Sequence, residues 1–145
     1  MLRLLFRFFD YARHRRRQRL LGAREAAGLR GEDLAHRYLE RRGFTVVARN
    51  FRTRAGTAEI DIVAWDGDKL VFVEVKTRTS EEYGRPERAM SEGKRRRLFR
   101  GAQEYVRRAD VDWQRIRFDL VTVVLDRPPR IEHQRDIYPL RAAAR

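Results

Sequence analysis

The sequence predicts an α/β domain in which helices flank a mixed central sheet. Two observations carry this prediction. Residues 58–78 hold two runs of β-branched and aromatic residues around an Asp-Gly turn, and helical patterns lie on either side of this hairpin. The chain has 145 residues, of which 42% are hydrophobic, so it is long enough to form one domain with its own core.

The elements are expected in the order helix, three strands, helix, strand and a short edge strand. In the first helix, an apolar stripe contains Leu34, Ala35, Tyr38 and Leu39, and Gly31 lies at its centre, where it would allow close approach to the sheet. The expected ranges are 28–42, 44–51, the hairpin 58–78, 94–108, 115–125 and 130–133.

The hairpin has a definite expected register. If the turn is centred between Gly67 and Asp68, facing residues have numbers that sum to 135, so Asp61 faces Glu74. By the same rule Glu59 faces Lys76. Strand alternation then places these four on one face. The opposite, apolar face would contain Ile60, Ile62, Ala64, Val71, Val73 and Val75.

A carboxylate pair at this position needs a physical explanation. Two carboxylates about 5 Å apart repel by about 3 kcal/mol at an effective dielectric near 20. A shared proton, a divalent cation or a neighbouring ammonium group would offset this repulsion, and oxygen ligands suit Mg²⁺ or Mn²⁺. The alternative is a surface cluster in which Glu59 and Asp61 pair with Lys76 or nearby arginines. The spacing alone leaves both interpretations open.

The same residues carry a family resemblance. Asp61 followed by Glu74-Val75-Lys76 resembles the signature of PD-(D/E)xK nucleases. The longer string, residues 59–64 with 71–78, resembles the bacterial YraN family, and the similarity covers roughly residues 28–140. This resemblance implies a restriction-endonuclease-like core, similar to that of archaeal Holliday-junction resolvases. It also implies an Mg²⁺- or Mn²⁺-dependent deoxyribonuclease that cleaves DNA, with branched or junction DNA among its expected substrates.

The resemblance also implies roles for individual residues. Asp61 and Glu74 would bind one or two metal ions, and Lys76 would orient the attacking water. Glu32 is a third candidate ligand, because the first helix of the resolvase-like nucleases carries a glutamate that joins the metal site. From its position alone, Glu32 also fits a carboxylate that complements the helix dipole in the first turn. Asp119 is expected to pair with an arginine such as Arg117 or Arg49.

The charge distribution points to a nucleic-acid partner, and the family resemblance implies that this partner is DNA. The formal net charge is +13, and nearly all of the excess lies in residues 1–30 and 85–108. The second segment supplies the expected phosphate-binding residues Lys94, Arg95, Arg96, Arg97 and Arg100. For Lys94 a structural role, with its stem packed on the domain, is equally compatible with the sequence. A non-catalytic nucleic-acid-binding module is therefore the main alternative to an enzyme.

Residues 1–27 are expected to form a basic, amphipathic extension, and residues 28–145 the nuclease-like domain. Charged residues interrupt the apolar run of the extension, so neither a signal peptide nor a transmembrane segment is expected. A scaffold that acts through this extension is a further alternative. The chain has no cysteine, which fits a reducing cytoplasm. His14, His36 and His133 lack metal-ligand spacing and are expected at the surface. The oligomeric state stays open, with a homodimer among the alternatives.

Overall fold

The computed structural model describes residues 22–80 and 92–140, so most of the expected extension 1–27 lies outside the described residues. The described helices are α2 (Ala23–Arg41), α3 (Glu92–Ala109) and the short 3₁₀ helix η1 (Trp113–Arg115). The strands are β1 (Thr45–Arg52), β2 (Glu59–Asp66), β3 (Lys69–Arg78), β4 (Ile116–Val124) and β5 (Arg130–Gln134). The order of elements is the predicted one.

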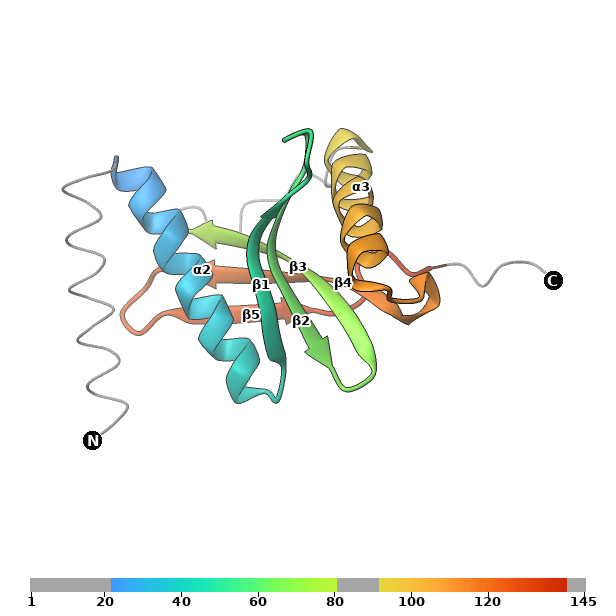
Figure 1. The fold of residues 1–145 in the computed structure, drawn as a ribbon. Helices are drawn as coiled ribbons and strands as arrows, with labels where there is room; N and C mark the ends of the chain where they lie inside the picture. Colours follow the sequence, from blue (N-terminus) through green and yellow to red (C-terminus); the bar gives the residue numbers. More distant parts are fainter. Residues whose placement is uncertain (1–21, 81–91, 141–145) are drawn as a thin grey trace.

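The five strands form one mixed sheet in the order β1-β2-β3-β4-β5 (Figure 1). Neighbouring strands are antiparallel except β3 and β4, which are parallel. A parallel pair needs a crossover connection, and α3 lies within the segment that joins β3 to β4. Figure 1 also shows a strong twist, since β4 and β5 cross the view at a steep angle to β1 and β2.

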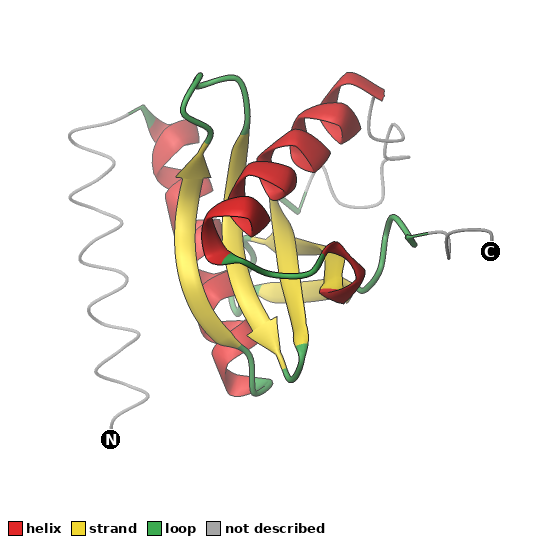
Figure 2. Cartoon of the chain, turned by 45° about the vertical axis from the view of Figure 1, so that its right-hand side comes forward, coloured by secondary structure: helices red, strands yellow, loops and turns green. Residues whose placement is uncertain are grey.

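The two helices cover opposite faces of this sheet. Figure 2 shows one helix in front of the strands, α3, and the other behind them, α2. The core under α2 contains Ala35, Leu39, Phe44, Ile62, Ala64, Val71, Val73, Val121 and Val123. The core under α3 contains Ile60, Val63, Leu70, Phe72, Leu98, Ala102, Val106, Ile116 and Phe118. An α/β fold with a restriction-endonuclease-like core, as the sequence predicts, is therefore what the chain adopts.

Gly31 sets the closeness of α2 to the sheet. A Cβ atom added at this buried glycine would lie 1.9 Å from Oγ1 of Thr77 on β3, a distance that no side chain tolerates. The predicted close approach of the first helix at Gly31 is thus confirmed. Because Glu32 follows directly, the same approach brings its carboxylate near the sheet.

The helix α2 begins at Ala23, five residues before the expected start, and spans both sides of the expected domain boundary at residue 28. Glu32 therefore lies in the middle of the helix. The interpretation of Glu32 as a first-turn carboxylate that complements the helix dipole is wrong, because that effect is confined to the first turn. Within residues 22–80 and 92–140, no helix is both long and apolar enough to cross a membrane.

The predicted hairpin register is confirmed, but the predicted alternation is not. Ile62 pairs with Val73 and Asp66 with Lys69, and both pairs sum to 135. Ile62 packs in the core under α2, whereas Ile60 packs in the core under α3, within reach of the α3 backbone at Gly101. Side chains two residues apart in a regular strand share a face, so β2 changes face between these two residues.

The neighbouring strand β1 changes face at the same level. Its Arg49 reaches α2, where it pairs with Asp33, whereas the ring of Phe51 lies 5.1 Å from that of Tyr105 on α3. Asn50, between them, has a φ of +50°, a left-handed conformation that asparagine adopts more readily than most residues. Asn50 is thus the residue of β1 at which the face changes, at the same level as the change in β2.

A candidate active site at the end of the hairpin

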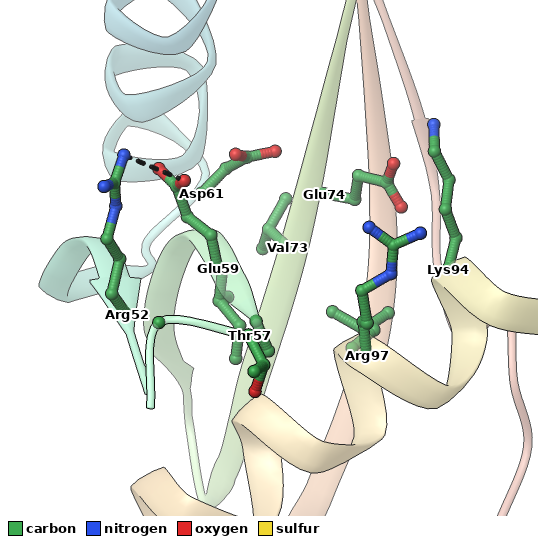
Figure 3. Close-up of a pocket in the computed structure, with 12 residues that line it drawn as sticks. Arg52, Thr57, Glu59, Asp61, Val73, Glu74, Lys94 and Arg97 are labelled. Carbon is green, nitrogen blue, oxygen red and sulfur yellow. Dashed lines mark ion pairs between the residues drawn. The ribbon is translucent and has the colours of Figure 1, made fainter. Parts of the chain in front are cut away.

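A pocket of about 320 Å³ lies where β2 begins, between the sheet and α3. It is lined by Arg52, Gly56, Thr57, Ala58, Glu59, Ile60, Asp61, Val73, Glu74, Lys94, Arg97 and Leu98. Figure 3 shows Glu74 with Lys94 and Arg97 on one side of this pocket, and Arg52 with Glu59 on the other. The structure thus brings Asp61 and Glu74 to one pocket, together with two of the expected phosphate-binding residues.

Asp61 lies where β2 and β3 separate. The ladder of paired residues between these strands ends at Ile62 and Val73, so Asp61 and Glu74 are not ladder partners, and neither are Glu59 and Lys76. The direct cross-strand pairing expected from the sequence is wrong at this end of the hairpin. Instead, the Val75 amide donates a hydrogen bond of 2.8 Å to Oδ2 of Asp61. This bond fixes the carboxylate in the gap between the strands.

The surroundings of Asp61 are unfavourable for a negative charge. Burial raises the pKa of Asp61 to about 7, and the nearby carboxylates of Glu32, Glu74 and Glu59 act in the same direction. The hydrogen bond from the Val75 amide acts against this rise but does not outweigh it. A carboxyl group with a pKa near 7 exchanges protons near neutrality, and such groups are enriched at functional sites.

Glu32 reaches this region from α2, but it already has a cationic partner. Arg49 donates a hydrogen bond of 3.3 Å from Nη2 to Oε2 of Glu32, and one of 2.8 Å from Nη1 to Oδ1 of Asp33. Its Nε is buried and has no hydrogen-bond partner among the described residues. The carboxylate of Glu32 raises the pKa of Asp61, so it lies near the site as the sequence predicts. Arg49 neutralises part of the charge of Glu32.

The basic residues of α3 divide into different environments. Lys94 and Arg97 line the pocket. Arg96 pairs with Glu92 at 3.8 Å, and the guanidinium of Arg95 lies over aromatic rings. Arg100 is exposed on the same helix. The five expected phosphate-binding residues therefore do not share one environment.

Lys76 and Glu59 complete the account of the predicted site. Val71, Val73 and Val75 contact the core under α2, so alternation places Glu74 and Lys76 on the α3 side of β3. Lys76 does not line the pocket itself. Glu59 pairs with Arg52 at 3.2 Å, as in the alternative of a surface salt-bridge cluster.

One buried ionic cluster lies outside this pocket, on the side of the sheet that α2 covers. Asp119 is 0% exposed and accepts hydrogen bonds of 2.8 Å from Nε of Arg117 and 2.9 Å from its Nη2. Its pairing with Arg117 confirms one of the two partners expected from the sequence. Nε2 of His133 lies 2.8 Å from Oδ2 of Asp119, and the His133 side chain is only 5% exposed. The expectation of a surface His133 is wrong, because the carboxylate and the rings of Tyr38 and Phe44 enclose it.

The pKa of Asp119 reflects this enclosure. Burial acts to raise it, but hydrogen bonds from His133, Arg117 and the Asp136 amide outweigh burial and lower the pKa to about 2. All of these partners are satisfied, so the cluster is suited to holding β4, β5 and the following segment together. Alternating apolar residues around Asp119 were the only sequence signal for this burial.

The carboxylates of the pocket fit a hard divalent cation in their chemistry. Asp61 and Glu74 supply oxygen donors, and the raised pKa of Asp61 reflects negative charge that a cation would offset. Among residues 22–80 and 92–140, however, no three acidic, histidine or cysteine side chains are arranged to hold a metal ion. The fit therefore rests on two carboxylates, with Glu32 engaged by Arg49.

The fold and the pocket together define the chain as an α/β protein with a restriction-endonuclease-like core and a carboxylate pair at the open end of its hairpin. Its family follows from comparison with known proteins. Residues 31–123 match the model of the uncharacterised protein family UPF0102, which is the YraN family, and the chain belongs to that family.

Relatives match over most of their length. A UPF0102 protein from Solibacter usitatus is 54% identical over 138 residues, which cover 95% of this chain and all of the relative. A UPF0102 protein from Rhodococcus opacus is 45% identical over 78% of this chain and 96% of its own length. One from Geobacter sulfurreducens is 44% identical over 78% of this chain and 88% of its own length. The family resemblance expected from the hairpin residues is thereby confirmed.

Proposed function

We propose that this protein is a metal-dependent endonuclease that hydrolyses phosphodiester bonds in DNA. The observation that carries the proposal is one pocket that joins two carboxylates, Asp61 and Glu74, to two cations, Lys94 and Arg97. Carboxylates can hold a divalent ion, and cations can hold the phosphate on which the ion acts. A pocket with both serves phosphoryl transfer better than it serves a reaction on an uncharged substrate.

Asp61 and Glu74 would hold Mg²⁺ or Mn²⁺, with Glu32 able to join them if Arg49 releases it. The bound ion would polarise the phosphate and lower the pKa of an attacking water. The Val75 amide holds Oδ2 of Asp61 at 2.8 Å, which fixes the position of this ligand. Deprotonation of Asp61, whose pKa is near 7, would accompany binding of the ion.

The basic residues would orient the substrate. Lys94 and Arg97 lie one turn apart on α3 and face the Glu74 side of the pocket (Figure 3), where they can hold the scissile phosphate. Lys76 lies on the same side of β3, two residues beyond Glu74, and would stabilise negative charge that develops on the phosphate.

The alternative is a non-catalytic nucleic-acid-binding module in which the carboxylates are structural. The ion pair between Glu59 and Arg52 favours it, because that pair already uses one carboxylate of the pocket without a metal. Both functions use the same basic residues, so binding alone does not separate them.

The decisive experiment removes the carboxylate of Glu74. For the enzyme, the Glu74→Ala variant should lose Mg²⁺- or Mn²⁺-dependent nicking of duplex and branched DNA by at least 100-fold while it keeps DNA affinity. Lys76→Ala should also lose nicking. Glu25→Ala, at an exposed position of α2, is the matched control and should cleave normally. A wild-type protein that binds DNA but nicks none of these substrates, with a melting temperature indifferent to divalent cations, would establish the binding module instead.

A further inference from the structure

We propose that Arg95 and Tyr138 form a subsite that stacks an unpaired nucleobase beside the carboxylate pocket. The substrate class that this subsite favours is a nucleic acid with a single-stranded segment. The inference rests on the proposed function only because it takes the ligand to be nucleic acid. Three features carry it: the way in which Tyr138 is held, the position of the Arg95 guanidinium, and the closeness of both to the pocket.

Tyr138 comes from the segment after β5, far in sequence from α3, yet two backbone contacts hold this segment in place. The Asp136 amide donates a hydrogen bond of 3.0 Å to Oδ1 of the buried Asp119. The next amide, of Ile137, donates one of 2.8 Å to the carbonyl oxygen of Phe118. The ring of Tyr138 consequently lies against Phe99, with 6.0 Å between their centroids. A ring fixed in this way can receive a ligand at little entropic cost.

Arg95 covers this aromatic surface instead of extending into solvent. Its guanidinium carbon lies 4.9 Å from the ring centroid of Tyr138 and 5.4 Å from that of Phe99. The residue as a whole is exposed, so a ligand can approach it from solvent. Guanidinium planes and aromatic rings are the two kinds of protein surface on which unpaired bases stack.

The subsite lies next to the residues proposed to hold the phosphate. Arg95 sits on α3 between Lys94 and Arg97, both of which line the pocket. Tyr138 is held beside these residues through Arg95, whose guanidinium carbon lies over its ring. A nucleotide whose phosphate contacts Lys94 or Arg97 therefore has an aromatic surface within reach of its base.

This arrangement selects for substrate form. In a continuous duplex each base is already stacked between its neighbours, so a base reaches Arg95 only after it has left the helix. A single-stranded segment offers its bases without that cost. The subsite should therefore favour single-stranded or locally unpaired DNA, with little dependence on base identity, because every base has a stacking face.

The first experiment measures binding in EDTA, where no cleavage interferes. The ligands are a short single-stranded oligonucleotide and an abasic oligonucleotide of the same length and charge. The wild-type protein should bind the first about tenfold more tightly, which corresponds to about 1.4 kcal/mol at 25 °C. Tyr138→Leu and Arg95→Lys should each abolish most of this preference. Tyr138→Phe keeps the ring and should retain it.

Arg115→Ala provides the matched control. Arg115 stacks on Trp65 at 5.3 Å, a contact of the same kind at the far end of the hairpin from the pocket. This variant should keep the preference for bases. A second experiment uses oligonucleotides that contain 5-iodouracil, whose photochemical adducts should map to Tyr138 in the wild type and disappear from this region in Tyr138→Leu.

The outcomes separate this inference from the proposed function. Equal affinities of the wild type for the two oligonucleotides, or adducts confined to other regions, would overturn the subsite even if cleavage depends on Glu74 as proposed. A preference for bases that is lost in Tyr138→Leu and kept in Tyr138→Phe would support the subsite even if no cleavage is found. Circular dichroism of each variant ensures that only folded protein is compared.

Discussion

The substitution Asp61→Asn tests the electrostatics of the pocket directly. It removes the negative charge but keeps a side-chain oxygen that can accept the hydrogen bond from the Val75 amide. The packing and the strand geometry should therefore change little. Any change in stability then reports on the cost of placing a charge at this position, among the carboxylates of Glu32, Glu59 and Glu74.

The expected magnitude follows from the pKa. The ordinary value is 3.8, and in the folded protein the pKa of Asp61 is about 7, a difference of about three pH units. Each unit corresponds to about 1.4 kcal/mol, so the charge costs up to about 4 kcal/mol above pH 7. Because the folded state binds this proton more tightly, the wild-type protein should lose stability as pH rises from about 4 to 7. Asp61→Asn should lack this decline, so it should be the more stable protein at pH 8 and similar to wild type at pH 4.

Urea unfolding in EDTA between pH 4 and 9 measures this difference. Asp68→Asn, at the exposed hairpin turn, is the matched control and should follow the wild-type curve. Added Mg²⁺ should raise the free energy of unfolding of the wild type at pH 8 and have little effect on Asp61→Asn. Parallel pH profiles of wild type and Asp61→Asn would refute the reasoning, because they would mean that Asp61 is charged at little cost.

Two further predictions concern the packing of α2 on the sheet and the buried Asp119 cluster. Gly31→Ala should lower the free energy of unfolding by about 1–3 kcal/mol, since its Cβ would lie 1.9 Å from Oγ1 of Thr77. Gly28→Ala, on the same helix with open space around it, should instead raise the free energy of unfolding by about 0.5–1 kcal/mol. Equal effects of the two substitutions in urea unfolding would contradict the close approach of α2 to β3. Asp119→Ala should destabilise by about 3–5 kcal/mol, because Arg117 and His133 lose a buried partner. In the wild type, the stability contributed by the charged form of Asp119 should disappear as pH falls from about 4 to 2. If Asp119→Ala lowers the free energy of unfolding by less than about 1 kcal/mol in thermal or urea unfolding, the cluster is not needed for stability.

The parts of the fold that could be predicted depend on local signals. The Asp-Gly turn fixes the hairpin register, because a slip of one residue would move every apolar side chain to the wrong face. The periodicity of α2 marked Ala35 and Leu39 as core residues, and both are fully buried. Gly31 stood at the centre of that stripe, and only a glycine there allows the observed distance to Thr77.

The parts that could not be predicted depend on contacts between distant segments. His133 looked like a surface residue because nothing near it in sequence indicates the carboxylate of Asp119, which lies fourteen residues earlier on the adjacent strand. Tyr138 likewise gave no sign of Arg95, which reaches it from another element. Periodicity reports which face of an element is buried, but it does not report which distant side chain covers that face.

The change of face at Asn50 explains why the site differs from the pattern in the sequence. Regular alternation would have placed Ile60 under α2 and Asp61 on the α3 side, in a continuous ladder with Glu74. Instead, Ile60 packs under α3, and the ladder between β2 and β3 ends before Asp61. The Asp61 carboxylate then fills the gap between two strands, where Glu32 of α2 and Glu74 of β3 both act on it.

Two backbone features accompany the carboxylate cluster. The left-handed Asn50 lies opposite Asp61 in the register of β1 and β2, and it coincides with the break that opens the gap. Gly31 lets α2 approach β3 closely enough for Glu32 to reach the same place. Neither residue carries a charge. The raised pKa of Asp61 arises from burial and from these converging carboxylates, so the chemistry of the pocket depends on the close approach at Gly31 as well as on the acidic residues themselves.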